Sequence, residues 1–267
     1  MDLQLHGKRA LVTGSSSGIG EGIAKVLAKE GTTVIVHGRN KEQVNRVAQE
    51  ISDSGGKALI AIGDLSTDKA ANHVVSQVLS SVGGVDILIN NAGQYENSGW
   101  MDTPPERWAE IYNANVISTV RMVQLLVPQM KQLGWGRIIQ IASVGATQPF
   151  PVVAHYSATK AALLNLTVSL AKQLAETGIT VNTVSPGIIV TSRVEEDFRQ
   201  MAASFGWGTN WTEIEKQVLQ KVLYNPVGRL GRVEDVDNLV AFLCSPLAGY
   251  INGANFRIDG GSAVSIN

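Results

Sequence analysis

Short apolar runs of strand length alternate with longer, helix-like segments along almost the whole chain. The predicted strands cover residues 10–13, 33–36, 58–62, 87–89, 138–141, 181–184 and 255–258. The predicted helices cover residues 19–29, 41–52, 68–82, 106–130, 155–176 and 233–243, with Pro128 near the end of the fourth. Strands that are apolar on both faces and separated by helices indicate a parallel sheet with a helical layer on each face. The sequence therefore predicts an α/β fold built on a doubly wound parallel sheet of about seven strands.

The domain organisation is predicted to be simple. We find no internal repeat and no linker rich in Pro, Gly or Ser, so residues 1–267 are expected to form one domain. Residues 188–226 break the alternation and hold five of the fifteen aromatic residues: Phe198, Phe205, Trp207, Trp211 and Tyr224. We expect this segment to be an insertion beside a substrate site. Packing of the segment onto the body explains the same aromatics equally well.

Composition and charge exclude several classes of function. The formal net charge is −1, from 22 basic and 23 acidic residues, and no basic run is present, so neither nucleic acid nor a membrane surface is an expected partner. The four histidines are scattered without ligand spacing, so no metal site is expected, and Cys244 in its apolar stretch is expected to fill the core. With no apolar run of about 18 residues and no signal-like N-terminus, we expect a cytoplasmic protein.

A glycine-rich turn follows the first predicted strand and leads directly into a helix. Its glycines are spaced Gly-x-x-x-Gly-x-Gly. Such a turn lets the backbone approach a pyrophosphate, while the helix N-terminus offers free N–H groups and a positive dipole. The residues expected to contact the phosphates are Gly14, Ser16, Ser17, Gly18, Ile19 and Gly20.

The end of the second strand indicates which dinucleotide would bind. A carboxylate there would bind the ribose 2′-hydroxyl of NAD and repel a 2′-phosphate. The sequence has Arg39 at this point instead, and a guanidinium suits phosphate geometry. We therefore expect NADP, with Arg39 on the 2′-phosphate and Ser17 assisting. The alternative interpretation is that Arg39 is a solvated surface residue.

A tyrosine and a lysine mark the candidate chemistry. Tyr156 and Lys160 are spaced i and i+4, so they share one face of the fifth helix. Tyrosine has an ordinary pKa of about 10. A nearby ammonium and the positive ring of an oxidised nicotinamide favour the phenolate and would lower this pKa. Ser143 ends the preceding strand, at the edge where ligands bind in open α/β sheets. A bare Tyr-x-x-x-Lys pair is common, so its function depends on these neighbours.

Together these motifs resemble the short-chain dehydrogenase/reductase family, from Lys8 to Gly261. Further matches are Asp64-Leu65, the tetrapeptide Asn90 to Gly93, Asn115, and the segment Pro186 to Thr191. The resemblance implies a Rossmann fold, hydride transfer between NADP(H) and a small-molecule carbonyl or secondary alcohol, and a homotetramer. It implies catalytic roles for Asn115, Ser143, Tyr156 and Lys160. The cofactor contacts it adds are Asp64, Leu65, Asn91, Ala92, Gly93, Tyr156, Lys160, Pro186, Gly187, Ile189 and Thr191.

Two rival functions stay open. Many members of the family reduce 3-oxoacyl chains on acyl carrier protein, and the turn at residues 175–178 offers no basic residue for such an acidic partner. A cofactor-binding sensor or scaffold without turnover is the alternative outside the enzyme class. The intact set of four catalytic positions argues against it.

Overall fold

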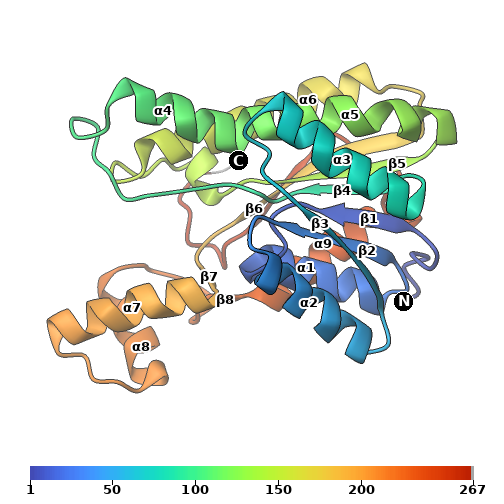
Figure 1. Cartoon of the computed structure of the whole chain (residues 1–267). Coiled ribbons are helices and arrows are strands. Elements are labelled where there is room, and N and C mark those ends of the chain that lie inside the picture. Colours follow the sequence, from blue (N-terminus) through green and yellow to red (C-terminus); the bar gives the residue numbers. More distant parts are fainter. Residues whose placement is uncertain (266–267) are drawn as a thin grey trace.

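The computed structural model describes residues 1–265, which form a seven-stranded parallel sheet covered by helices on both faces (Figure 1). The strand order is β3-β2-β1-β4-β5-β6-β9. The strands are β1 (Arg9–Val12), β2 (Thr33–Gly38), β3 (Lys57–Ile62), β4 (Ile87–Asn90), β5 (Gly136–Ile141), β6 (Ile179–Pro186) and β9 (Asn255–Ile258). The predicted fold class is confirmed, and the last two residues of the predicted domain, 266–267, lie outside the described residues.

The two helical layers bury separate apolar clusters against the sheet. Helices α1 (Gly18–Lys29), α2 (Lys41–Asp53) and α9 (Val233–Cys244) cover one face. Helices α3 (Asp68–Val82), α5 (Ser118–Leu133) and α6 (Ala154–Gln173) cover the other (Figure 1). Neighbouring strand residues alternate between them: Leu11 packs in the α3–α5–α6 cluster and Val12 in the α1–α2–α9 cluster. This is why the predicted strands are apolar at consecutive positions. Cys244 is fully buried, as expected.

The fourth predicted helix, residues 106–130, differs in the structure. It is divided into α4 (Pro105–Tyr112) and α5 by a π-helical turn at Asn113–Ile117, in which the Ser118 N–H donates to the carbonyl of Asn113. Pro128 lies inside α5 rather than at its end. One missing N–H removes a single helical hydrogen bond, whereas Gly134, with a φ of 64°, provides the left-handed residue at which helices commonly end.

The segment 188–226 contains two helices that project from the sheet. They are α7 (Ser192–Phe205) and α8 (Trp211–Lys221), and they lie beside the two-stranded pair of β7 (Ile189–Val190) and β8 (Gly231–Arg232) (Figure 1). They bury a small apolar cluster of their own that includes Phe198, Ile214 and Val218. The aromatics therefore divide: Phe198 is buried within the segment, whereas Phe205 and Tyr224 are exposed.

Two kinds of feature are missing from the part of the chain that the structure describes. None of its helices is long and apolar enough to cross a membrane. Residues 1–265 also contain no cluster of His, Cys, Asp and Glu side chains suited to a metal ion.

A buried carboxyl group lies where α9 packs on α1. Asp237 is 5% exposed, its Oδ1 has no hydrogen-bond partner among the described residues, and a Cβ at Gly22 would collide with its side chain. Burial, together with the nearby Glu234, raises the pKa of Asp237 from 3.8 to about 8. The folded protein then keeps a proton that the unfolded chain loses above pH 4. The free energy of unfolding should therefore fall as the pH rises from about 4 to about 8.

We predict that Asp237→Ala stabilises the protein at pH 8 by about 1–3 kcal/mol, because it removes an unsatisfied buried polar group. Urea denaturation at several pH values between 4 and 8 measures this change, and the variant should lose part of the pH dependence. Asp53→Ala, at the exposed end of α2, is the control and should change little. Equal destabilisation of Asp237→Ala at every pH would contradict the prediction.

Candidate active site

The glycine-rich turn between β1 and α1 requires glycine at two positions for steric reasons. Gly14 has a φ of 63°, and a Cβ there would lie 2.9 Å from the Cα of Ala92. Gly20 packs so closely on the Gly14 carbonyl and the Asn91 side chain that a Cβ would collide with both. The helix α1 begins at Gly18, with Ser17 as its N-cap residue. The turn therefore brings the loops after β1 and β4 into backbone contact.

Three side chains that the sequence analysis did not single out hold this turn. The Ser15 hydroxyl donates to the Val12 carbonyl (2.7 Å) and accepts from the His37 N–H (2.9 Å). Nδ1 of the buried His37 accepts the Gly14 N–H at 3.1 Å. Burial lowers the pKa of His37 to about 4, against the opposing effects of the Gly63 carbonyl and Asp64. His37 is therefore a neutral acceptor at physiological pH. The third side chain, Thr13, accepts from the N–H groups of Asn91 and Ala92.

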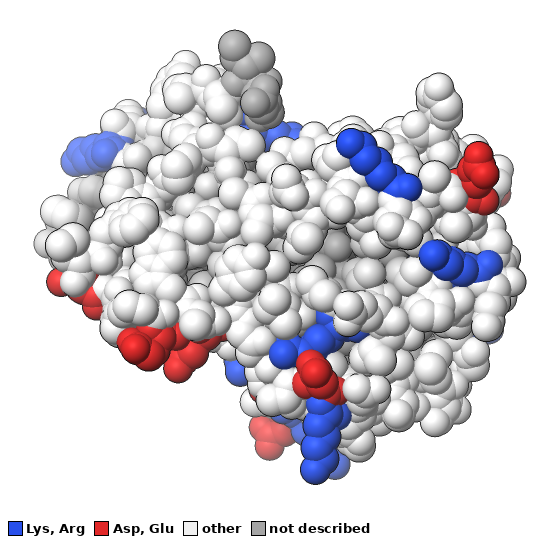
Figure 2. All heavy atoms as spheres, turned by 90° about the horizontal axis from the view of Figure 1, so that it is seen from above, with Lys and Arg blue, Asp and Glu red and all other residues white. Residues whose placement is uncertain are grey.

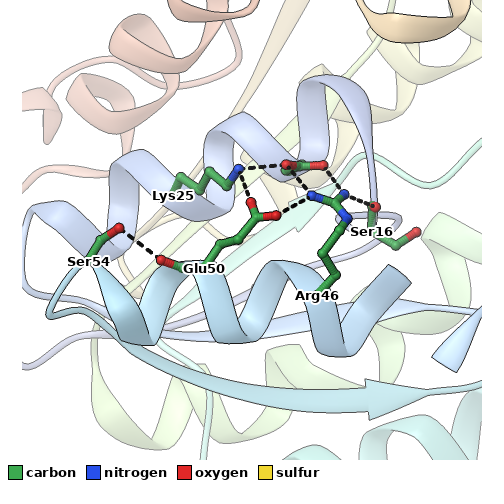
Figure 3. Close-up of polar contacts among 6 residues, drawn as sticks. Ser16, Lys25, Arg46, Glu50 and Ser54 are labelled. Carbon is green, nitrogen blue, oxygen red and sulfur yellow. Dashed lines mark hydrogen bonds and ion pairs between the residues drawn. The ribbon is translucent and has the colours of Figure 1, made fainter. Parts of the chain in front are cut away.

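A network of four charged side chains supports the turn from α2. Arg46 donates to the carbonyl of Ser16 at 3.3 Å, as Figure 3 shows. Its guanidinium also pairs with Glu21 of α1 (2.7 Å) and Glu50 (2.8 Å), and Lys25 bridges the same two carboxylates. Each of these ion pairs is at least partly exposed and so contributes little alone. The network nevertheless fixes α2 against the turn.

A cavity of about 510 Å³ opens at the carboxyl ends of β1, β2 and β4. It gathers nine of the predicted cofactor residues along its wall: Gly14, Ser16, Ser17, Arg39, Asp64, Leu65, Asn91, Ala92 and Gly93. Other predicted residues lie outside the wall, namely Gly18, Ile19, Gly20, Tyr156, Lys160, Pro186, Gly187, Ile189 and Thr191. His37, Gln94 and Arg193 also line it and were not predicted.

Arg39 and Asp64 lie near each other at one end of this cavity. Asp64 accepts hydrogen bonds from the Ser66 hydroxyl and from the N–H groups of Leu65 and Ser66. The Ser66 bond is the largest of the influences that lower the pKa of Asp64, and the positive charge of Arg39 contributes too. The carboxylate is therefore ionised and oriented by its own turn, which leaves the guanidinium of Arg39 available to an anion.

The predicted residues of segment 186–191 lie where β6 leaves the sheet. Pro186 ends β6, and the Gly187 N–H donates to the Ile258 carbonyl at 2.7 Å. Ile189 belongs to β7 and lines a different cavity. Thr191 is the N-cap residue of α7, and its methyl group lies 3.4 Å from the position of a Cβ at Gly18. This segment therefore joins the glycine-rich turn to α7.

Asn115 lies within the π-helical turn and binds the loop after β4. Its Oδ1 accepts the Gln94 N–H at 2.7 Å, and its Nδ2 donates to the Gln94 carbonyl (2.9 Å) and to Thr159 Oγ1 (3.0 Å). A Cβ at Gly93 would lie 3.1 Å from Asn115 Oδ1 and 3.6 Å from Lys160 Nζ. Because Gly93 has no side chain, the side chains of Asn115 and Lys160 lie directly behind the cavity wall at this residue.

Ser143, Tyr156 and Lys160 meet where β5 ends and α6 begins. Ser143 caps a short 3-10 helix (Val144–Ala146), where its hydroxyl accepts the Gly145 N–H at 3.1 Å. A hydrogen bond from Ser143 favours the phenolate of Tyr156, yet burial outweighs it and raises the pKa of Tyr156. Lys160 Nζ is buried 5.4 Å from the Tyr156 ring centroid and donates to the Ile141 carbonyl at 2.8 Å. Burial lowers the pKa of Lys160 to about 8.

Among the protein's own groups, burial raises the pKa of Tyr156, whereas the sequence analysis expected Lys160 and an oxidised nicotinamide ring together to lower it. The prediction depended on two positive charges, Lys160 and an oxidised nicotinamide ring. In this structure the ammonium faces a backbone carbonyl, and desolvation of the phenol dominates.

The comparisons with known proteins agree on one family. The short chain dehydrogenase family matches residues 8–202. The chain is 40% identical to the uncharacterized oxidoreductase YvaG of Bacillus subtilis, across the full length of both. It is 36% identical to the 3-oxoacyl-[acyl-carrier-protein] reductase FabG of Aquifex aeolicus, over 98% of this chain and 99% of that one. It also superposes on L-sorbose reductase from Gluconobacter frateurii, solved with NADPH and L-sorbose, with a TM-score of 0.94, 34% identity and full coverage of both chains. The chain belongs to the short-chain dehydrogenase family.

Proposed function

We propose that the protein is an NADP(H)-dependent oxidoreductase that transfers a hydride between the nicotinamide and a carbonyl or secondary alcohol. The observation that carries this proposal is the meeting of Ser143, Tyr156 and Lys160 beside a glycine-walled cavity with Arg39 at its far end. The relatives support it, since L-sorbose reductase was solved with NADPH and a 3-oxoacyl reductase from Agrobacterium tumefaciens with NADP.

The residues of the cavity fit a dinucleotide. The close approach of Gly14 to Ala92 leaves no room for a side chain at position 14, so a phosphate would meet backbone there. Arg39 and Ser17 would hold a 2′-phosphate, and Asp64 and Leu65 would lie at the adenine end. Asn91, Ala92 and Gly93 would contact the cofactor along its length, and Pro186, Gly187, Ile189 and Thr191 would hold the nicotinamide amide. Bound nicotinamide would supply or accept the hydride.

The protein's own groups handle the proton. Ser143 and Tyr156 would bind the substrate oxygen and polarise it, and Tyr156 would donate the proton during reduction. Lys160 would bind ribose hydroxyls and assist Tyr156. Asn115 fixes the loop at Gln94. Its backbone carbonyl would accept a hydrogen bond from a water that helps return the proton to Tyr156. We propose reduction as the direction in the cell, because it is the usual role of NADPH.

The substrate is proposed to be a small ketone or its alcohol, and residues 188–226 are proposed as the insertion that covers its site. Reduction of 3-oxoacyl groups on a carrier protein remains the second candidate, favoured by the 36% identity to the Aquifex aeolicus reductase. A binding protein without turnover is the third.

We predict that the purified protein consumes NADPH with at least one member of a panel of ketoses, simple ketones, aldehydes and 3-oxoacyl thioesters. Absorbance at 340 nm follows the reaction. Tyr156→Phe should lower kcat by about 100-fold or more, because it removes the proton donor. Tyr250→Phe, at a fully exposed tyrosine, is the control. Tight NADPH binding without turnover across the panel would favour the sensor instead.

We further predict that Arg39→Ala raises the KM for NADPH by about tenfold or more and leaves that for NADH within about twofold. The reason is that only NADPH carries the phosphate that a charge-assisted hydrogen bond from Arg39 would bind. Steady-state kinetics with both cofactors measure the ratio. Lys29→Ala, which removes an exposed positive charge at the end of α1, should leave it unchanged. An unaltered preference in Arg39→Ala would show that Arg39 is a surface residue.

We also propose a homotetramer. The face over α4, α5 and α6 carries few charged side chains (Figure 2) and exposes Tyr112, Leu133 and Val168. A face with few charges and several exposed apolar side chains is suited to self-association. A cytoplasmic location likewise stays a proposal.

We predict a mass near four times 28.5 kDa in sedimentation equilibrium. Val168→Glu should reduce this mass, because it places a charge in this weakly charged face, whereas Val222→Glu, just beyond α8, should not. A wild-type monomer at micromolar concentration would refute the assembly.

A further inference from the structure

The cavity has two cationic side chains in its wall, and the function proposed above uses one of them. Arg39 comes from the end of β2, whereas Arg193 comes from the first turn of α7. The third basic residue of the wall, His37, is neutral, since burial lowers its pKa to about 4. Arg193 is therefore a positive charge that the segment 188–226 contributes to a cavity whose other wall residues lie between Gly14 and Ser118.

Arg193 reaches the cavity beside the glycine-rich turn. Thr191, two residues earlier, packs its methyl group against Gly18, so the start of α7 lies directly on the start of α1. The same cavity wall includes Ser16 and Ser17 of the turn, as well as Gly93 and Gln94. Arg193 therefore lines the same cavity as the N-cap residue of α1, where helix N–H groups suit a phosphate.

Tyr95 holds the guanidinium in place. The Arg193 Cζ lies 4.6 Å from the Tyr95 ring centroid, which is within the range of a cation–π contact. The Tyr95 hydroxyl is bonded to Asp197, one turn further along α7, at 3.4 Å. Arg193 and Asp197 of α7 therefore both contact the side chain of Tyr95, which lies in the loop after β4. Among residues 1–265, no carboxylate forms an ion pair with Arg193, so its charge is left for a ligand.

NADP has two anionic groups, and NAD has only one of them. The 2′-phosphate occurs in NADP alone and is assigned above to Arg39. The diphosphate occurs in both NADP and NAD and has no side-chain cation assigned to it. We propose that Arg193 binds the cofactor diphosphate and so links α7 to the glycine-rich turn when the dinucleotide is bound. This inference rests on the proposed function, since it requires that the cavity binds a dinucleotide.

The linkage would extend to the reacting group through Tyr95. The Tyr95 ring packs edge-on against Tyr156, with centroids 5.9 Å apart. The side chain that orients Arg193 thus also forms one wall beside the proposed proton donor. Binding of the diphosphate would fix Arg193, Tyr95 and the start of α7 together.

The test is equilibrium binding by calorimetry, which needs no turnover. Wild type, Arg193→Met, Arg193→Lys and Arg39→Ala are titrated with NADPH, NADH and ADP-ribose. Arg193→Met should weaken all three ligands by a similar factor of about tenfold, because each contains the diphosphate. Arg193→Lys, which keeps the charge, should recover part of the loss. Arg39→Ala should weaken NADPH alone.

The matched control is Arg199→Met, which removes an equal charge from the same helix. Arg199 pairs with Glu195 and donates to the Thr209 carbonyl, and it does not line the cavity. Its dissociation constants should stay within about twofold of wild type, since no ligand charge is contacted. Unchanged affinity of Arg193→Met for ADP-ribose, with or without a raised KM for substrate, would overturn the assignment. Failure of the wild type to bind any of the three ligands would instead overturn the proposed function.

Discussion

The hydrogen bonds of Thr13 join β1 and β4, the two neighbouring strands between which the strand order of the sheet reverses. From β1 the chain builds outward through β2 and β3, and from β4 it builds the other way through β5, β6 and β9. Loops leaving β1 and β4 would therefore diverge and open a crevice at this point. Thr13 Oγ1 donates to the Ile89 carbonyl and accepts from the N–H groups of Asn91 and Ala92, and Asn91 Nδ2 returns two bonds to the carbonyls of Thr13 and Gly14. The crevice stays open to a ligand while its base is closed by these bonds.

Burial then determines the charge state of the groups around the crevice. His37 is kept neutral, which preserves its Nδ1 as the acceptor for Gly14. Lys160 has a lowered pKa because it is buried with a single carbonyl contact, and Tyr156 has a raised one because its phenolate would be desolvated. Both shifts favour the neutral forms of these two side chains. An anionic, hydroxyl-bearing ligand placed next to Lys160 would favour its ammonium, and that charge would in turn favour the phenolate. A ligand charge next to Lys160 would therefore shift the pKa values of both side chains toward their ionised forms.

Much of the fold could be predicted because each strand is buried on both faces. The seven predicted strands match β1 to β6 and β9 within a few residues. Short continuous apolar runs bounded by turns are typical of strands buried on both faces. The positions of Arg39 and Ser143 at strand ends could be predicted for a related reason, because the carboxyl ends of parallel strands lie at one edge of the sheet. The π-helical turn could not, because the apolar repeat continues unbroken from α4 into α5. Nor could the contact of His37 with Gly14, which joins β2 to the loop after β1 through a side chain whose identity has no periodic signal.

The sequence of the segment 188–226 says little about where the segment lies relative to the sheet. Its apolar residues satisfy one another, with Phe198, Ile214 and Val218 buried in a cluster separate from both main clusters. A unit with its own core gains little apolar burial from the sheet, so its placement depends on the few contacts at its base. Those include the pairing of β7 with β8, the contact of the Thr191 methyl group with Gly18, and the contacts of Arg193 and Asp197 with Tyr95. Only the last involves charged side chains, and of these Arg193 lines the cavity. A bound anion can therefore change part of the free energy that positions the segment, whereas the apolar core of the segment would be unaffected.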